Sequence, residues 1–85
     1  MCTMIAEQTA MTGVGRGPGG WFALDTAYVS YDHPQELGVE HALNIDFVNA
    51  AAGPGARVAV ELNRESARAL AETILKTLEI SEGVD

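Results

Sequence analysis

Cysteine, histidine and positive charge are all scarce in this sequence. Its 85 residues include one cysteine, two histidines and five basic residues against twelve acidic ones, which gives a formal net charge of −7. A single cysteine cannot form a disulfide within the chain, so a secreted disulfide scaffold is excluded. Phosphate backbones and anionic lipid surfaces repel an acidic chain that has no basic patch. We therefore expect neither nucleic acid nor a membrane among its partners.

Long apolar runs are also missing. No stretch approaches the roughly 20 apolar residues that span a bilayer, and no basic segment followed by an apolar one opens the chain as a secretory signal would. We expect a soluble, cytoplasmic protein. The hydrophobic content of 47% indicates a folded chain, and we expect a single domain over residues 1–85. A domain of this size gains stability from a subunit partner or a bound metal.

Four extended segments are expected, over residues 3–12, 21–33, 41–49 and 57–62. The third is the clearest, because His41, Leu43, Ile45 and Phe47 alternate with smaller or polar residues. Turns are expected at "GVGRGPGG", "PQELGVE" and "AAGPGA", which separate the four segments. The first of these does not fit the phosphate-binding pattern G-x-G-x-x-G, and it leads into a strand instead of a helix. It is therefore interpreted as a hairpin turn.

A helix is expected after Asn63, which can cap it, with Glu65 favouring its positive end. Its apolar residues recur at helical spacing: Ala67, Leu70, Ala71, Ile74, Leu75 and Leu78. The order is ββββα. The predicted fold class is α+β, a four-stranded antiparallel meander with one C-terminal helix packed on one face.

The turns suggest how the strands pair. The hairpin around residues 34–40 sets His33 against His41, and the glycine-rich hairpin sets Cys2 opposite or nearly opposite His33. Counting along the strands then pairs Met4 with Tyr31, Ala6 with Val29, Tyr31 with Leu43, Val29 with Ile45, Ala27 with Phe47, Ile45 with Leu62 and Phe47 with Val60. Directly opposed residues share a face of the sheet. The pairing therefore predicts one apolar face, which the helix can cover.

The same pairing brings Cys2, His33 and His41 together at one end of that face. A thiolate and two imidazoles form a ligand set suited to zinc, copper, iron or nickel, and three protein ligands leave a position for water or a small-molecule ligand. Asp32 and Glu40 flank the three residues as a fourth ligand or as acceptors for imidazole N–H groups. We therefore expect a small metal-binding protein. The metal could have either a catalytic or a structural role.

Other interpretations of these residues stay open. The two histidines match none of the compact zinc spacings, and histidines at strand ends are commonly solvated loop residues. Cys2 paired with His33 would alternatively form a thiolate–imidazolium nucleophile, as in a thiol enzyme. A third alternative is a dimeric binding or interaction module that has neither metal nor enzymatic activity.

The opposite face of the sheet carries two further groups. One is an acidic row, because the expected registers align Glu7, Tyr28, Asp46 and Glu61. We interpret this row as a solvated stripe. The other is apolar and comprises Met11, Phe22, Leu24 and Val48. Because one helix covers only one face, the apolar group favours a homodimer contact. Alternatively, the sheet curls and the glycine-rich loop folds over it.

Several stretches together resemble a known family. They are "MCT", "GWFAL", "DHP", "EHALNIDFVN", "GPGARVAVEL" and "ESARALAE", and they cover most of the chain. These stretches are similar to a family of small actinobacterial proteins known only as a domain of unknown function. The resemblance implies no activity, cofactor or catalytic residue.

Overall fold

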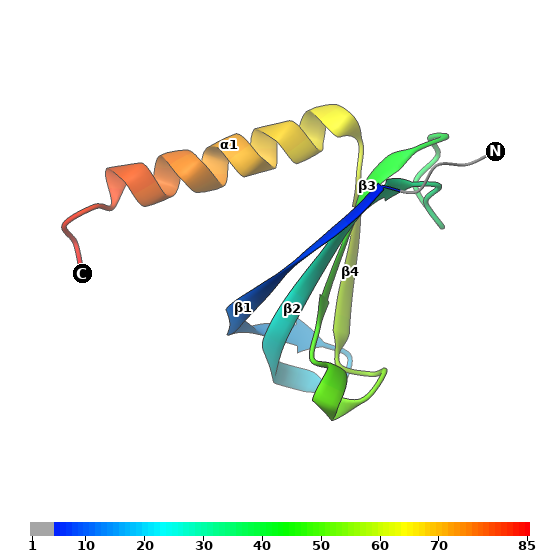
Figure 1. The fold of residues 1–85 in the computed structure, drawn as a ribbon, viewed down its shortest axis with the longest axis horizontal. Helices are drawn as coiled ribbons and strands as arrows, with labels where there is room; N and C mark the ends of the chain where they lie inside the picture. Colours follow the sequence, from blue (N-terminus) through cyan, green and yellow to red (C-terminus); the bar gives the residue numbers. More distant parts are fainter. Residues whose placement is uncertain (1–4) are drawn as a thin grey trace.

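The computed structural model describes residues 5–85 as an antiparallel sheet followed by a helix (Figure 1). The elements are β1 (Ile5–Gly17), β2 (Gly20–Asp32), β3 (Ala42–Val48), the short 3₁₀ turn η1 (Ala50–Ala52), β4 (Arg57–Leu62) and α1 (Arg64–Ile80). The strands lie in the order β1-β2-β3-β4. The predicted α+β meander with one C-terminal helix is confirmed.

The predicted register of the central hairpin is confirmed. Tyr31 pairs with Leu43, Val29 with Ile45 and Ala27 with Phe47. The register between β3 and β4 differs from the prediction by two residues, since Ile45 pairs with Val60 and Phe47 with Val58. A shift of two leaves every side chain on its predicted face, because the period of a strand is two residues.

The register of the first hairpin was predicted wrongly, by one residue. Ala6 pairs with Ser30 and not with Val29, which pairs with Glu7. The physical reason lies in the glycine-rich segment: β1 continues to Gly17, a two-residue turn leads to Gly20 at φ 110°, and the register shifts once between Ala10 and Gly13. Sequence alone did not show this irregularity. A shift of one exchanges the two faces of a strand, so Glu7 shares a face with Val29.

One face of the sheet is mainly apolar, and we call it the inner face. It carries Ile5, Glu7, Thr9, Ala27, Val29, Tyr31, Leu43, Ile45, Phe47, Val58, Val60 and Leu62. The remaining alternate residues form the outer face. There Tyr28 is flanked by Gln8 and Asp46, and Glu61 pairs with Asn44. The predicted acidic row is therefore wrong in its alignment, and Asp46 is engaged by Arg57 in an ion pair of 2.6 Å.

The apolar group of the outer face is half-buried within the chain. Phe22, Leu24 and Val48 of this group lie on the outer face, whereas Met11 lies within the register shift between Ala10 and Gly13, and all four are half-buried. The hairpin end curls toward β4, since a Cβ at Gly17 would lie 3.2 Å from the Phe22 ring and 3.8 Å from the carbonyl oxygen of Arg57. A Cβ at Gly15 would lie 3.2 Å from Leu24. The glycines permit this approach, which corresponds to the curled alternative.

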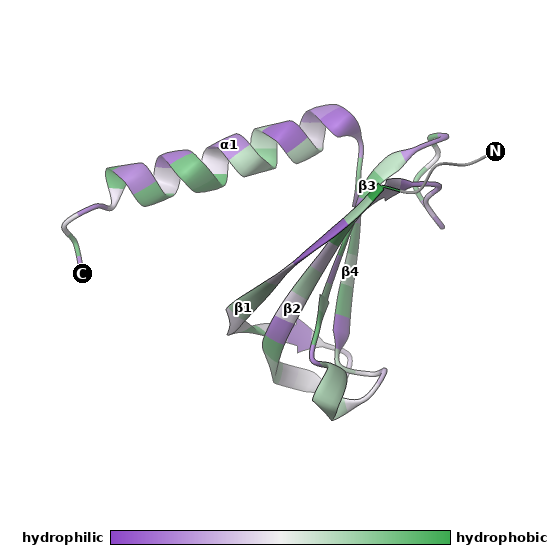
Figure 2. Cartoon of the chain, viewed as in Figure 1, coloured by the Kyte–Doolittle hydropathy of each residue, from purple (hydrophilic) through white to green (hydrophobic). Residues whose placement is uncertain are grey.

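Helix α1 begins as its sequence predicts. The Asn63 side chain accepts a hydrogen bond of 2.8 Å from the backbone N–H of Ser66, and Glu65 lies in the first turn. Because only Asn63 separates β4 from α1, the helix starts at the edge of the sheet. It then diverges from the strands, so that sheet and helix form the two arms of a V (Figure 1). Apolar and polar residues alternate along it (Figure 2).

Burial is sparse throughout the described part of the chain. The buried hydrophobic residues of 5–85 are three alanines, Ala27, Ala42 and Ala56. No residue of α1 is buried, and its Leu75 is 66% exposed. The Cα radius of gyration is 14.4 Å, against roughly 12 Å for a compact domain of this length. The apolar stripe of α1 and the inner face therefore stand apart across an open space.

Candidate functional site

The loop between β2 and β3 brings the two histidines of the chain together. The ring centroids of His33 and His41 lie 4.6 Å apart, with an angle of 29° between the ring planes. Both residues are exposed. Their predicted proximity is confirmed, and it follows from the register of β2 and β3, which ends with Asp32 opposite Ala42.

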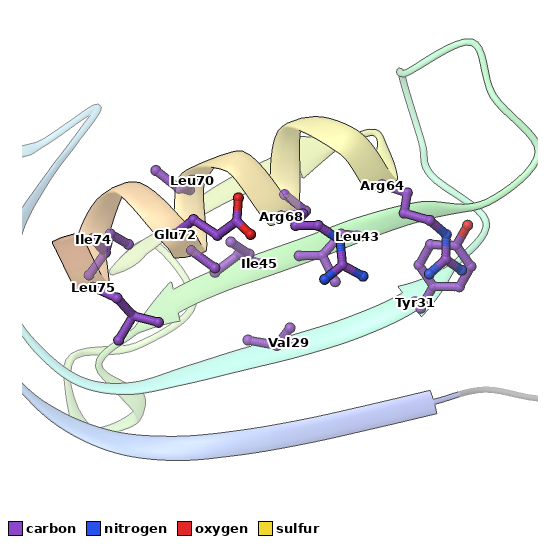
Figure 3. Close-up of a pocket in the computed structure, with 12 residues that line it drawn as sticks. Val29, Tyr31, Leu43, Ile45, Arg64, Arg68, Leu70, Glu72, Ile74 and Leu75 are labelled. Atoms are coloured by element: carbon purple, nitrogen blue, oxygen red, sulfur yellow. The ribbon is translucent and has the colours of Figure 1, made fainter.

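The histidine pair continues as a row of stacked side chains toward the helix. His41 stacks on Tyr31 at 5.9 Å between centroids and 18° between planes. The guanidinium carbon of Arg64 lies 4.5 Å from the centroid of the Tyr31 ring, a cation–π contact. We call His33, His41, Tyr31 and Arg64 the histidine stack. Figure 3 shows Arg64 reaching from the start of α1 over Tyr31.

A backbone carbonyl of the loop and the side chain of Asp32 both contact His33. Its Nδ1 lies 2.8 Å from the carbonyl oxygen of Glu40. A carbonyl oxygen only accepts, so Nδ1 donates the hydrogen bond, and in the neutral ring Nε2 carries the lone pair. The backbone N–H of His33 donates to Oδ1 of Asp32 at 2.7 Å. Asp32 and Glu40 are the two acidic neighbours expected at this site, and both contact His33. Asp32 does so through its carboxylate, and Glu40 through its main-chain carbonyl.

The other side of the loop is held by Glu61 of β4. Its Oε2 accepts a hydrogen bond from the backbone N–H of Gln35 at 2.7 Å, and its Oε1 accepts from Glu36 and Leu37, each at 2.9 Å. These three bonds, with the one from Gln35 contributing most, lower the pKa of Glu61 below its usual value. We call this arrangement the Glu61 clamp. Sequence reasoning missed it, because the donors are main-chain groups that no residue pattern indicates.

The predicted metal ligands are placed only in part. The structure brings His33 and His41 together, whereas Cys2 lies outside the described residues. Because β1 pairs with β2 one residue away from the expected register between Ile5 and Ala10, that register no longer argues for Cys2 opposite His33. Within residues 5–85, no three His, Cys, Asp or Glu side chains are grouped closely enough to hold a metal ion.

A second feature adjoins the histidine stack. A groove of about 580 Å³ lies between α1 and the inner face, and we call it the α1 groove. Its walls are lined by Val29, Tyr31, Leu43, Ile45, Arg64, Ala67, Arg68, Leu70, Ala71, Glu72, Ile74 and Leu75 (Figure 3). Most of these side chains are apolar, and the three charged ones all come from α1. Such a surface suits an apolar partner bordered by charge.

The fold and its two surface features define a small α+β domain, a four-stranded meander whose C-terminal helix diverges from the sheet. The chain belongs to a family of unknown function (DUF6295), whose model matches residues 1–84. The resemblance of the sequence to a domain of unknown function is thereby confirmed. No curated protein and no solved structure matches the chain. Among the described residues, no helix has the length and apolar character needed to cross a bilayer.

Proposed function

We propose that this protein binds one transition-metal ion at the histidine stack, through His33 and His41 with Cys2 as the third ligand. The observation that supports the proposal is the 4.6 Å separation between the imidazole rings of His33 and His41. They are the two histidines of the whole chain. Zinc, copper, iron and nickel all accept this combination of imidazole and thiolate ligands.

The hydrogen bond between His33 and Glu40 also supports metal binding. Histidines that ligate a metal usually donate their second ring N–H to a carboxylate or a backbone carbonyl, which fixes the tautomer and the direction of the ring. His33 donates from Nδ1 to the Glu40 carbonyl at 2.8 Å, so Nε2 is its ligating atom. The Glu61 clamp holds the same loop from the opposite side, which lowers the cost of ordering the ligands.

Elemental analysis of protein purified without a metal-affinity tag tests the proposal. We expect about one equivalent of a transition metal, and we expect Cys2→Ser and His41→Ala each to lose it. Tyr31→Phe is the matched control, because it keeps the ring that stacks on His41 and removes only a hydroxyl. Wild-type protein that contains no metal, together with unchanged stability of all three variants, would contradict metal binding. Rapid alkylation of Cys2 in metal-free protein at neutral pH would favour the thiol-enzyme alternative instead.

A second candidate function is supported by the α1 groove. An interaction module without enzymatic activity would bind a partner between the exposed stripe of α1 and the inner face. The large side chains Leu70, Ile74 and Leu75 line this groove and are 43%, 51% and 66% exposed. Contiguous exposed apolar side chains of this kind mark interaction sites.

A further inference from the structure

We infer that the α1 groove is filled by α1 of a second copy of this chain, and that the two helices lie antiparallel about a twofold axis. The inference rests on the interaction-module function proposed above and is independent of metal binding. It places the dimer contact on the inner face. The outer apolar group, on which the sequence first suggested a dimer, is half-buried by the chain's own hairpin.

The first argument is the missing core. Within residues 5–85 the buried hydrophobic side chains are those of three alanines. The larger apolar side chains are half-buried or exposed, so much of the apolar surface whose burial would offset the entropy cost of folding is still open to water. Helix α1 has 17 residues. Helices near this length are marginal in water and take most of their stability from packing an apolar face. The apolar stripe of α1 therefore requires a surface that the single chain does not bring close enough.

The second argument is the amount of exposed surface. The chain exposes 6621 Å², whereas a compact monomer of its mass would expose roughly 4,800 Å². The excess of roughly 1,800 Å² exceeds the roughly 800 Å² that each subunit buries in a standard interface. A second copy that buries roughly 1,800 Å² on each chain, or roughly 3,600 Å² in total, would bring the exposed surface into the ordinary range, and this total lies within the range of obligate homodimer interfaces. A small ligand in a groove of about 580 Å³ would cover far less.

The third argument is charge complementarity within α1 itself. At about 100° per residue, Arg64, Arg68 and Glu79 fall on the same flank of the apolar stripe, with the arginines near the start of the helix and the glutamate near its end. In an antiparallel pair, this flank of one helix faces the same flank of the other. Arg68 of each helix then lies beside Glu79 of its partner. The pattern is self-complementary, as a twofold contact requires.

Sedimentation and cross-linking test the inference on the full chain. We expect a species of twice the 9.0 kDa chain mass at micromolar concentration. In a Cys2→Ser background, Ala71→Cys places a thiol in the groove, and Ala69→Cys places one on the opposite side of the same helix. We expect a short bis-maleimide to convert Ala71→Cys to a covalent dimer at least tenfold faster than Ala69→Cys.

A monomeric wild-type chain would overturn the inference, and so would a dimer in which the two cysteine variants cross-link at equal rates. Binding of an apolar fluorescent dye tests the interaction-module proposal separately from the dimer proposal. A monomer that binds the dye, and loses it on Ile74→Glu, would keep the groove as a site for another partner. A monomer that does not bind the dye would remove both proposals.

Discussion

His33 and His41 lie with their rings 4.6 Å apart, although eight positions of sequence and a whole loop separate them. The loop between them is restrained on both sides. On one side His41 stacks against Tyr31, and on the other Glu61 accepts three backbone hydrogen bonds. The same junction carries the start of α1, since Arg64 lies over Tyr31. Changes to the loop, the sheet end or the helix start should therefore affect one another.

Replacing His41 by alanine should abolish tight metal binding. The change removes an imidazole ligand and the ring that stacks on His33, so the loss in affinity should exceed the roughly 10–100-fold that follows loss of an outer-shell hydrogen-bond partner. Titration with zinc or nickel, followed by competition with a chelator of known affinity, measures the effect. Equal affinity in wild type and His41→Ala would show that the metal, if bound, is held elsewhere.

Glu61→Gln should loosen the loop between β2 and β3. A neutral amide offers one acceptor oxygen in place of two charged ones, so it cannot keep all three hydrogen bonds to Gln35, Glu36 and Leu37. Amide hydrogen exchange at these three positions should accelerate, and the urea midpoint should fall. Glu36→Gln is the matched control, because it removes the same charge from the loop and leaves the Glu61 carboxylate in place. Exchange that is equally fast in both variants would contradict a clamp.

The Glu61 clamp also predicts how stability depends on pH. The pKa of Glu61 is lowered in the folded chain, so the folded state favours its charged form and binds protons less readily than the unfolded state. The contribution to stability is therefore complete above the ordinary glutamate pKa of about 4.3 and is lost as the pH falls through the lowered value. Urea midpoints of wild type and Glu61→Gln should differ at pH 7 and converge as the pH falls below the lowered pKa of Glu61. A constant difference across that range would argue against the clamp.

Much of the fold was predictable because it depends on periodicity. The alternation of His41, Leu43, Ile45 and Phe47 indicated β3 and its apolar face, and the position of the turn indicated the register with β2 that brings the histidines together. The first hairpin was not predictable in the same way. A register shift between Ala10 and Gly13 and a tight turn at the end of a glycine-rich strand leave no clear pattern in the residue types.

The position of α1 was predictable only in part, for a physical reason. A helical apolar stripe shows that one face is to be covered, and it does not show which surface covers it. The spacing of Leu70, Ile74 and Leu75 predicted a helix facing the sheet, and the structure leaves a groove between them. The Glu61 clamp was missed for a related reason, since three backbone N–H groups form it and every residue except proline supplies one.

Asn63→Ala should destabilise the chain through the start of α1. The Asn63 side chain satisfies the N–H of Ser66 at 2.8 Å, and loss of such a cap costs about 1 kcal/mol. Asn63→Asp keeps an oxygen acceptor at the helix start and should retain wild-type stability. Urea unfolding followed by far-ultraviolet circular dichroism measures both variants. A fall in stability of equal size in the two would point to some other role of the asparagine.

Reversing one charge on α1 should separate an antiparallel helix pair from other modes of association. In the proposed dimer, Arg68→Glu places a glutamate opposite Glu79 of the partner helix, and Glu79→Arg places an arginine opposite Arg68 of the partner helix. Each single variant should therefore weaken the dimer. Because each contact occurs twice across the twofold axis, and exposed pairs contribute about 0.2–1 kcal/mol each, we expect a roughly 2–30-fold rise in the dissociation constant. The double variant Arg68→Glu with Glu79→Arg restores opposite charges and should recover most of the affinity. Sedimentation equilibrium at low and high salt measures all four proteins, and additive losses in the double variant would be inconsistent with the antiparallel arrangement.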